Sequence, residues 1–281
     1  MGFDRPWLLF NLPAARRAPT SPGWLWERVR EPPEAIRAAV EAQALRLQPP
    51  EGLPRCLARA AEDLIGSVPT LSRIAEQSIA AIHVLSAEPG FDVSHSEPRW
   101  RSTIFVSTPE RLDGVGALRF AEGIIHEAMH LHLTNAEAIA PLVSDFDGQM
   151  RSPWRAERRS YQGVLHALFV FACLAAFFRD IRRQGDVMPA DCQRHVDRRL
   201  KEIQGEMARL DLPRLTAGLT ALGAESAAFC HAQASHVAGR HLEEVCLTFR
   251  AETEHAVVAS ERAGVRRRRD RTSRASGSLI D

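Results

Sequence analysis

The stretch Ile-Ile-His-Glu-Ala-Met-His-Leu at residues 124–131 decides both the fold and the site that this sequence predicts. His126 and His130 are four residues apart, so on a helix both imidazoles leave the same face about one turn apart. Two such rings can reach one metal ion at about 2.0–2.2 Å. Glu127 lies about 100° further round, where a carboxylate approaches a metal-bound water or a ligand rather than the ion itself. The uncharged neighbours of the motif favour a dry, packed metal site.

Two long helices are expected around this motif. Ser107-Thr108-Pro109-Glu110 has a hydroxyl cap, an early proline and a glutamate three residues after Ser107, which indicates a helix start. This first helix breaks or re-forms near Gly114 and Gly116 and runs through the motif to about Thr134. A second long helix is expected from Pro153, after Ser152, to about Arg183. The sequence therefore predicts a metal site between the HExxH helix and the long helix that follows it.

The rest of the chain reads as helical, apart from one short β-favouring region. Apolar residues at three- and four-residue spacing predict helices over 33–47, 53–65, 70–82, 191–210, 215–234 and 241–262. Two short runs, 91–94 and 103–106, favour strands and lie between turn residues. We therefore expect a mainly α fold with a small antiparallel β element.

Charge and composition suggest one domain and a tail. Residues 262–281 hold seven of the 36 basic residues and two of the 35 acidic residues, and they are poor in apolar side chains. Such a segment buries too little surface to fold, so we expect a single helical catalytic domain over 1–261 and a disordered basic tail over 262–281. A tail that docks an acidic partner is the alternative. Nothing in the charge pattern indicates a nucleic-acid-binding face.

The spacing of the cysteines and the hydropathy of the chain indicate the cellular compartment of the protein. The five cysteines are widely spaced and form no Cys-x-x-Cys pair, which suits reduced thiols. The apolar run Val164–Phe178 contains His166 and is short for a membrane span. We expect a soluble, cytoplasmic protein without a membrane or nucleic-acid partner.

Two residues compete to be the third metal ligand. Glu157 follows His130 by 27 residues, a spacing at which a glutamate completes the zinc site in one class of metallopeptidases, and His166 follows it by 36. On a continuous helix from Pro153, His166 shares a face with Arg155 and Arg159, whereas Glu157 lies on the opposite face. Two cations beside a metal suit an anionic ligand such as a dicarboxylate, which favours His166.

The same residues resemble a known family. His126–His130, Ser152–Arg159, Gly163–His166 and Val106–Pro109 are similar to the α-ketoglutarate-dependent HExxH-type peptide β-hydroxylases, which accompany ribosomally made, post-translationally modified peptides. The resemblance spans about Ser102 to Phe178. The family pattern has prolines around the second arginine, where this chain has Arg158 and Ser160.

The resemblance implies a function and a role for each site residue. It implies Fe(II) on His126, His130 and His166, and α-ketoglutarate whose distal carboxylate pairs with Arg159 or Arg155. The substrate would be a precursor peptide, hydroxylated at a side-chain Cβ. Glu127 would orient a ligand or a bound water.

Two other functions fit the residues. In a zinc metallopeptidase, Glu127 would activate a zinc-bound water as general base, and Glu157 would lie near the metal. In a non-catalytic peptide-binding partner of a maturation complex, the site would be degenerate and would hold almost no metal.

Overall fold

The computed structural model describes residues 22–183 and 188–235, and it is mainly helical with a small sheet, which confirms the predicted fold class. The helix expected over 241–262, the tail over 262–281 and the boundary between 261 and 262 lie outside the described residues.

The N-terminal helices are largely where the sequence places them. The structure has α1 (Trp24–Glu27), α2 (Glu34–Glu41), the 3-10 turn η2 (Pro50–Gly52), α3 (Arg55–Gly66) and α4 (Pro69–Ser78). The predicted helices over 33–47 and 70–82 end early, because β1 (Arg46–Leu47) follows α2 and β2 (Ala81–Ser86) follows α4. Both α3 and α4 pack against the long helix α5, so their apolar stripes are buried there.

The sheet is mixed, not purely antiparallel. Its order is β1-β2-β4-β3, with β3 at Ser94–Ser96 and β4 at Thr103–Ser107. The antiparallel pairing of β3 with β4 matches the prediction, but β2 pairs with β4 in parallel, with Ile82 opposite Ile104. The prediction that the helix from residue 70 extends to Ile82 was wrong. A short, mainly apolar run such as 81–86 fits a strand buried on both faces as well as it fits a helix.

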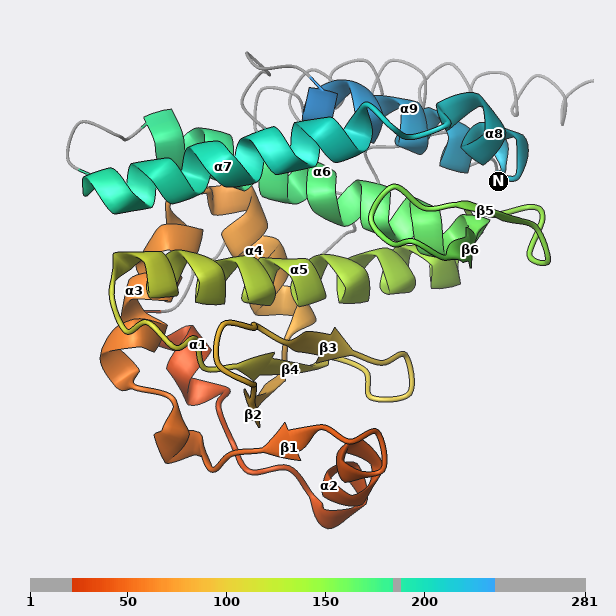
Figure 1. Ribbon diagram of the computed structural model, residues 1–281. Coiled ribbons are helices and arrows are strands. Elements are labelled where there is room, and N and C mark those ends of the chain that lie inside the picture. The colour runs from red at the N-terminus through yellow and green to blue at the C-terminus, as the bar shows by residue number, and fades with distance from the viewer. Residues whose placement is uncertain (1–21, 184–187, 236–281) are drawn as a thin grey trace, which may run out of the picture. The chain divides into compact units, whose positions relative to one another are not determined.

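Helix α5 (Gly114–Ile139) contains the HExxH motif and lies across the sheet, with α6, α7 and α9 on its other side (Figure 1). Its N-cap is Asp113, whose carboxylate accepts hydrogen bonds from the backbone N–H groups of Val115 and Gly116, both at 3.1 Å. The start predicted at Ser107 was wrong: Ser107 ends β4, and its hydroxyl accepts a bond from the Val93 N–H at 2.9 Å. The expected break near Gly114 and Gly116 is the true beginning of the helix.

Gly116 allows the start of α5 to lie against the preceding loop. A Cβ at this position would lie 1.7 Å from the carbonyl oxygen of Arg111, which is backbone and cannot move aside alone. We expect Gly116→Ala to lower the free energy of unfolding by about 2–4 kcal/mol, measured by urea denaturation. Gly66→Ala is the matched control, because a Cβ there meets nothing within 4 Å. That variant should change stability by less than about 1 kcal/mol, and equal losses in the two variants would show that the clash with Arg111 is not the cause.

The second long helix begins later than predicted. The segment after Ser152 forms a loop and then β6 (Arg158–Ser160), which pairs with β5 (Gln149–Arg151), and α6 runs from Tyr161 to Arg183. The helix expected from Pro153 was therefore wrong over its first two turns. The backbone of 158–160 forms its hydrogen bonds with 149–151, and the Ser152 hydroxyl accepts from the Trp154 N–H in a local turn. The partner strand lies seven to eleven residues earlier in the chain, outside the few residues that a cap pattern covers.

The remaining helices are α7 (Ala190–Met207), α8 (Leu212–Ala217) and α9 (Ala221–Ser235). The helix predicted over 191–210 is confirmed as α7. The one predicted over 215–234 is divided, because the chain turns at Gly218–Thr220.

Helix α6 forms the core of the helical layer. Within the described ranges it is the one helix with the length and apolar composition of a membrane span, and 83% of its most apolar window is buried inside the fold. It packs against α5, α7 and α9. This burial is consistent with a soluble protein and accounts for the almost entirely apolar composition of the helix.

Candidate metal centre

Helices α5 and α6 bring three histidines together. Nε2 of His126 lies 3.2 Å from Nε2 of His130, and Nδ1 of His130 lies 3.3 Å from Nδ1 of His166. The first pair follows from their four-residue spacing on α5, and the third ring comes from the second turn of α6. The structure thus places all three predicted histidine ligands in one row, with His130 in the middle.

The three rings do not converge on one point in this arrangement. His130 presents a different nitrogen to each neighbour, and one ion can bind only one nitrogen of a ring. Consistent with this, no set of three His, Cys, Asp or Glu side chains within 22–183 and 188–235 is arranged as a metal cluster. A single ion held by all three histidines therefore requires at least one ring to turn.

Burial keeps two of these histidines neutral. It lowers the pKa of His126 to about 4, with the positive charges of Arg199 and Arg155 adding to the effect. It lowers the pKa of His130 to about 3, where neighbouring His126 also contributes. The neutral imidazole is the form that binds metal ions, so near pH 7 both side chains are ready as ligands.

Glu127 is buried and held by two serines that the sequence pattern alone did not single out. The hydroxyls of Ser94 and Ser96 each donate to one of its carboxylate oxygens, both at 2.6 Å. Alternate residues of a strand point to the same face, so Ser94 and Ser96 both reach α5 from β3. The Ser-x-Ser pattern in a short strand was the available signal. This arrangement fixes the carboxylate on the wall next to the histidines.

Glu137 is a third residue that the sequence pattern did not single out. Its Oε2 atom lies 2.9 Å from Nε2 of His166 and accepts a bond from the Gln162 side chain at 2.8 Å. Glu137 follows His130 by seven residues on α5, which is only about 20° from two full turns, so both face the same side. A carboxylate on Nε2 holds the proton there and leaves the Nδ1 lone pair, which faces His130, free for a metal.

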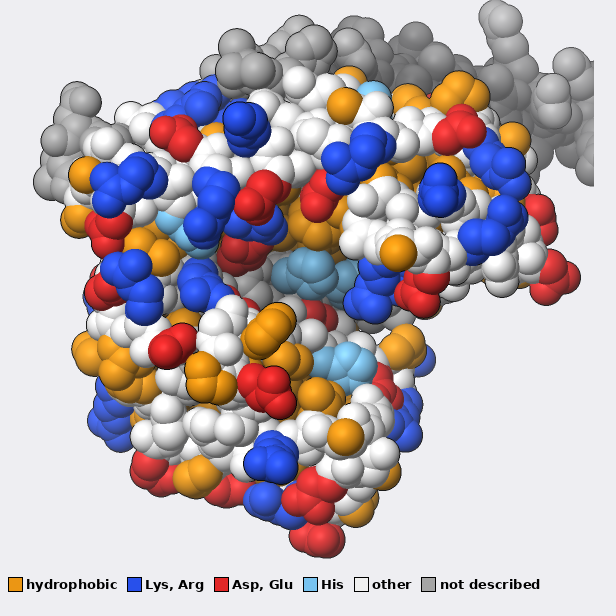
Figure 2. Space-filling model, viewed as in Figure 1, with side chains coloured by type: hydrophobic (Ala, Val, Ile, Leu, Met, Phe, Trp, Pro, Cys, Tyr) orange, Lys and Arg blue, Asp and Glu red, His pale blue; other side chains and the backbone are white. Residues whose placement is uncertain are grey.

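A cavity of about 820 Å³ opens beside the three histidines, and Glu127, Arg155 and Arg159 also line it. In the space-filling view, histidine side chains show at the bottom of a hollow (Figure 2). The prediction that the two arginines share a helix face with His166 was wrong. Arg155 lies in the loop before β6 and Arg159 lies in β6. They nevertheless line the same cavity, because β6 leads directly into α6.

Glu157, the alternative third ligand, is not among the residues that line this cavity. Its side chain is 65% exposed and lies 3.9 Å from the guanidinium of Arg155, which is 64% exposed. Of the two competing residues, the structure places His166 beside the motif and leaves Glu157 at the surface.

Aromatic rings form one wall of the cavity. Trp154 stacks on Phe171 with 5.4 Å between ring centroids and 4° between planes, and Phe171 contacts His126 edge-on at 5.8 Å. These contacts hold the His126 ring in place and shield it from water.

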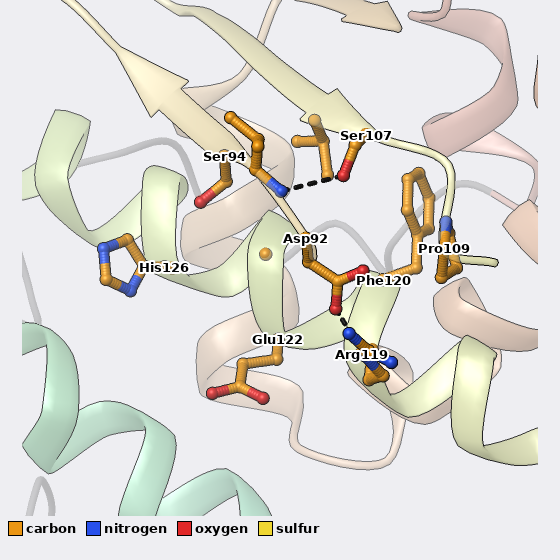
Figure 3. Close-up of a pocket in the computed structure, with 11 residues that line it drawn as sticks. Asp92, Ser94, Ser107, Pro109, Arg119, Phe120, Glu122 and His126 are labelled. Carbon is orange, nitrogen blue, oxygen red and sulfur yellow. Dashed lines mark hydrogen bonds and ion pairs between the residues drawn. The ribbon is translucent and has the colours of Figure 1, made fainter. Parts of the chain in front are cut away.

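A second, smaller pocket of about 130 Å³ also reaches His126 (Figure 3). Asp92 and Arg119 form an ion pair in its wall, and Glu122 lines it one turn before His126. Glu122 is paired with Arg199 of α7 at 2.5 Å. Burial raises the pKa of Glu122, and the Arg199 guanidinium opposes that shift. This ion pair ties α5 to α7 beside the histidines.

Comparison of the chain with protein-family models and with curated proteins gives no match. The inference of function therefore depends on the chemistry of the site and on the motif resemblance.

Proposed function

We propose that this protein is a non-haem Fe(II)- and α-ketoglutarate-dependent oxygenase that hydroxylates a side-chain Cβ of a ribosomally made precursor peptide. The supporting observation is one cavity lined by three imidazoles, His126, His130 and His166, together with Arg155 and Arg159. Neutral nitrogen ligands suit a divalent iron ion, and the arginines suit an anionic co-substrate.

The donor set fits such an ion. Three imidazoles leave further coordination positions open, as non-haem iron oxygenases require. Glu137 orients His166 through the ring nitrogen that does not bind the metal, which is the usual partner arrangement for a histidine ligand. Glu127, fixed by Ser94 and Ser96, supplies a negative charge beside the site without being a ligand itself.

The arginines give the cavity its selectivity for a dicarboxylate. Within the described ranges Arg159 forms no ion pair with a carboxylate, and Arg155 has only the loose contact with Glu157. A guanidinium can bind a carboxylate through two parallel hydrogen bonds, so Arg159 is the residue that would hold the distal carboxylate of α-ketoglutarate. Iron with this co-substrate supplies the oxidising power: C–H, O2 and α-ketoglutarate become C–OH, succinate and CO2.

The zinc metallopeptidase remains the alternative, because Glu127 lies on the cavity wall where a general base would act. Two observations make it the weaker candidate. Both oxygens of Glu127 already accept serine hydrogen bonds, and Glu157 lies outside the cavity. A peptide-binding protein without catalysis would show intact peptide binding and almost no bound metal.

We further propose that the protein acts in the cytoplasm on a peptide partner. Cys56, Cys192 and Cys230 are free thiols in the structure, as a reducing compartment favours.

Anaerobic titration tests the proposed function directly. The protein loaded with Fe(II) should develop a weak visible charge-transfer band when α-ketoglutarate is added. Arg159→Leu should keep its iron but bind α-ketoglutarate at least about tenfold more weakly, since one charge-assisted contact is lost. A fully iron-loaded protein without the band would contradict the proposal. Zinc in the purified protein, with peptide hydrolysis that Glu127→Gln abolishes, would support the peptidase instead.

A further inference from the structure

Five arginines gather in a groove of about 650 Å³ next to the candidate metal centre. They come from three separate segments: the β5–β6 hairpin, the turn after α7, and α8. They are Arg151, Arg155, Arg158, Arg209 and Arg214. All five are exposed, and basic side chains gather over the β5–β6 hairpin and α8 in Figure 2.

These guanidinium groups hydrogen-bond mainly to backbone carbonyls. Arg158 donates to the carbonyl of Gln149 at 2.7 Å, Arg214 to the same oxygen at 3.4 Å, and Arg209 to that of Pro153 at 3.3 Å. A carbonyl oxygen orients a guanidinium but does not neutralise its charge. The groove therefore presents several fixed positive charges side by side.

Acidic side chains at the groove are few. Asp211 lines it, but its carboxylate caps α8 by accepting from the Arg214 N–H at 3.1 Å. The one ion pair of Glu157 within the described residues is with Arg155, at 3.9 Å. Elsewhere on the described surface, arginines such as Arg111 and Arg199 each pair with two carboxylates. Like charges so close repel one another, so an anionic partner would stabilise this cluster.

The groove adjoins the cavity beside the three histidines. Trp154 and Arg155 line both. A chain bound along the arginines can therefore extend past Trp154 towards the histidines. Between the arginines, Pro153 and Ala156 give the groove apolar surface that a peptide side chain can cover.

We propose that this arginine groove binds an acidic stretch of a peptide, one that lies beside the residue presented to the metal centre. The identity of that peptide as the substrate rests on the proposed function; the binding itself does not. A peptide fits better than a nucleic acid, because single-stranded nucleic acids also need open aromatic faces for stacking. The one aromatic residue that lines the groove, Trp154, is already stacked on Phe171.

Fluorescence anisotropy on the metal-free full chain tests this proposal. The probe is a labelled oligoglutamate peptide of about eight residues, roughly 26 Å when extended. It should bind, with affinity that falls as salt increases, whereas a labelled oligolysine peptide should not. Arg158→Glu combined with Arg214→Glu should weaken oligoglutamate binding by at least about tenfold.

The matched control is Arg46→Glu combined with Arg59→Glu, which makes the same change in net charge at two exposed residues outside the groove. That variant should bind oligoglutamate within about threefold of the parent. Equal weakening in the two double variants would overturn the groove assignment, and so would an oligothymidylate of equal charge that binds as tightly as the peptide and at the same arginines. Because no metal or turnover is involved, this result is independent of whether the oxygenase proposal holds.

Discussion

His130→Ala should lose metal binding almost completely, because His130 is the central ring of the three and has a neighbouring imidazole at about hydrogen-bond distance on each side. Losing a partner of a ligand costs about 10–100-fold in metal affinity, so losing the ligand itself should cost more than about 100-fold. Fe(II) affinity measured by anaerobic titration, together with elemental analysis, gives the result. Hydroxylation of a peptide should disappear with the metal.

His95→Ala is the control for this experiment. His95 lies on β3 and lines the same cavity, but its ring lies 3.0 Å from the Glu97 carboxylate instead of the other histidines. The variant should bind iron within about threefold of the parent, because it loses no ligand. If His95→Ala removes the metal and His130→Ala does not, the ligand set is wrong.

Glu137→Gln should weaken metal binding by about 10–100-fold, whereas Glu157→Gln should leave it unchanged. Glu137 accepts from His166 and sets which ring nitrogen carries the proton, and glutamine offers no negative charge for that bond. Glu157 is exposed, and in the part of the chain that the structure describes its one ion pair is with Arg155. The two variants make the same chemical change at two different glutamates, so the pair separates the two candidate ligand sets.

The metal affinities of the two variants, compared with each other, distinguish the two candidate third ligands. Loss of metal in Glu157→Gln, with Glu137→Gln unaffected, would assign the third ligand to the loop before β6 and would favour the zinc peptidase. Equal, small effects in both would mean that His166 needs no oriented partner. Circular dichroism of each variant should be unchanged, because glutamine has the same shape as glutamate and fits the largely buried site of Glu137, while Glu157 is exposed.

The sequence predicts the part of the site that is local. The four-residue spacing of His126 and His130 places both rings on one face of α5 without reference to any other segment. His166 was favoured as the third residue partly because an imidazole in an apolar helix needs a partner. The deciding argument was a helix face shared with Arg155 and Arg159, and the structure does not contain that shared face. The sequence also held a signal for Glu137, because a residue seven positions after His130 lies on the same face of a helix. A single glutamate near a helix end most often faces solvent, however, so its spacing alone does not mark it as part of a site.

The parts that the sequence did not predict depend on contacts between distant residues. The cap-like Ser152-Pro153 does not start a helix, because 158–160 pairs with 149–151. The same pairing places Arg159 in a strand and not on the predicted helix face. Its side chain nevertheless lines the cavity beside the histidines. Ser94 and Ser96 are informative only when β3 is known to pack against α5. The neighbours that decide these features lie outside the short window that a cap or strand pattern covers: seven to eleven residues away for the hairpin, and more than thirty for the two serines.

The most direct test of the three-histidine centre is a crystal structure of the protein grown anaerobically with Fe(II), with anomalous diffraction at the iron edge. We predict one peak about 2.0–2.2 Å from a single nitrogen of each of His126, His130 and His166, with Glu137 on the far nitrogen of His166. An iron peak bound by Glu157, or none between these rings in crystals that contain the ion, would contradict it.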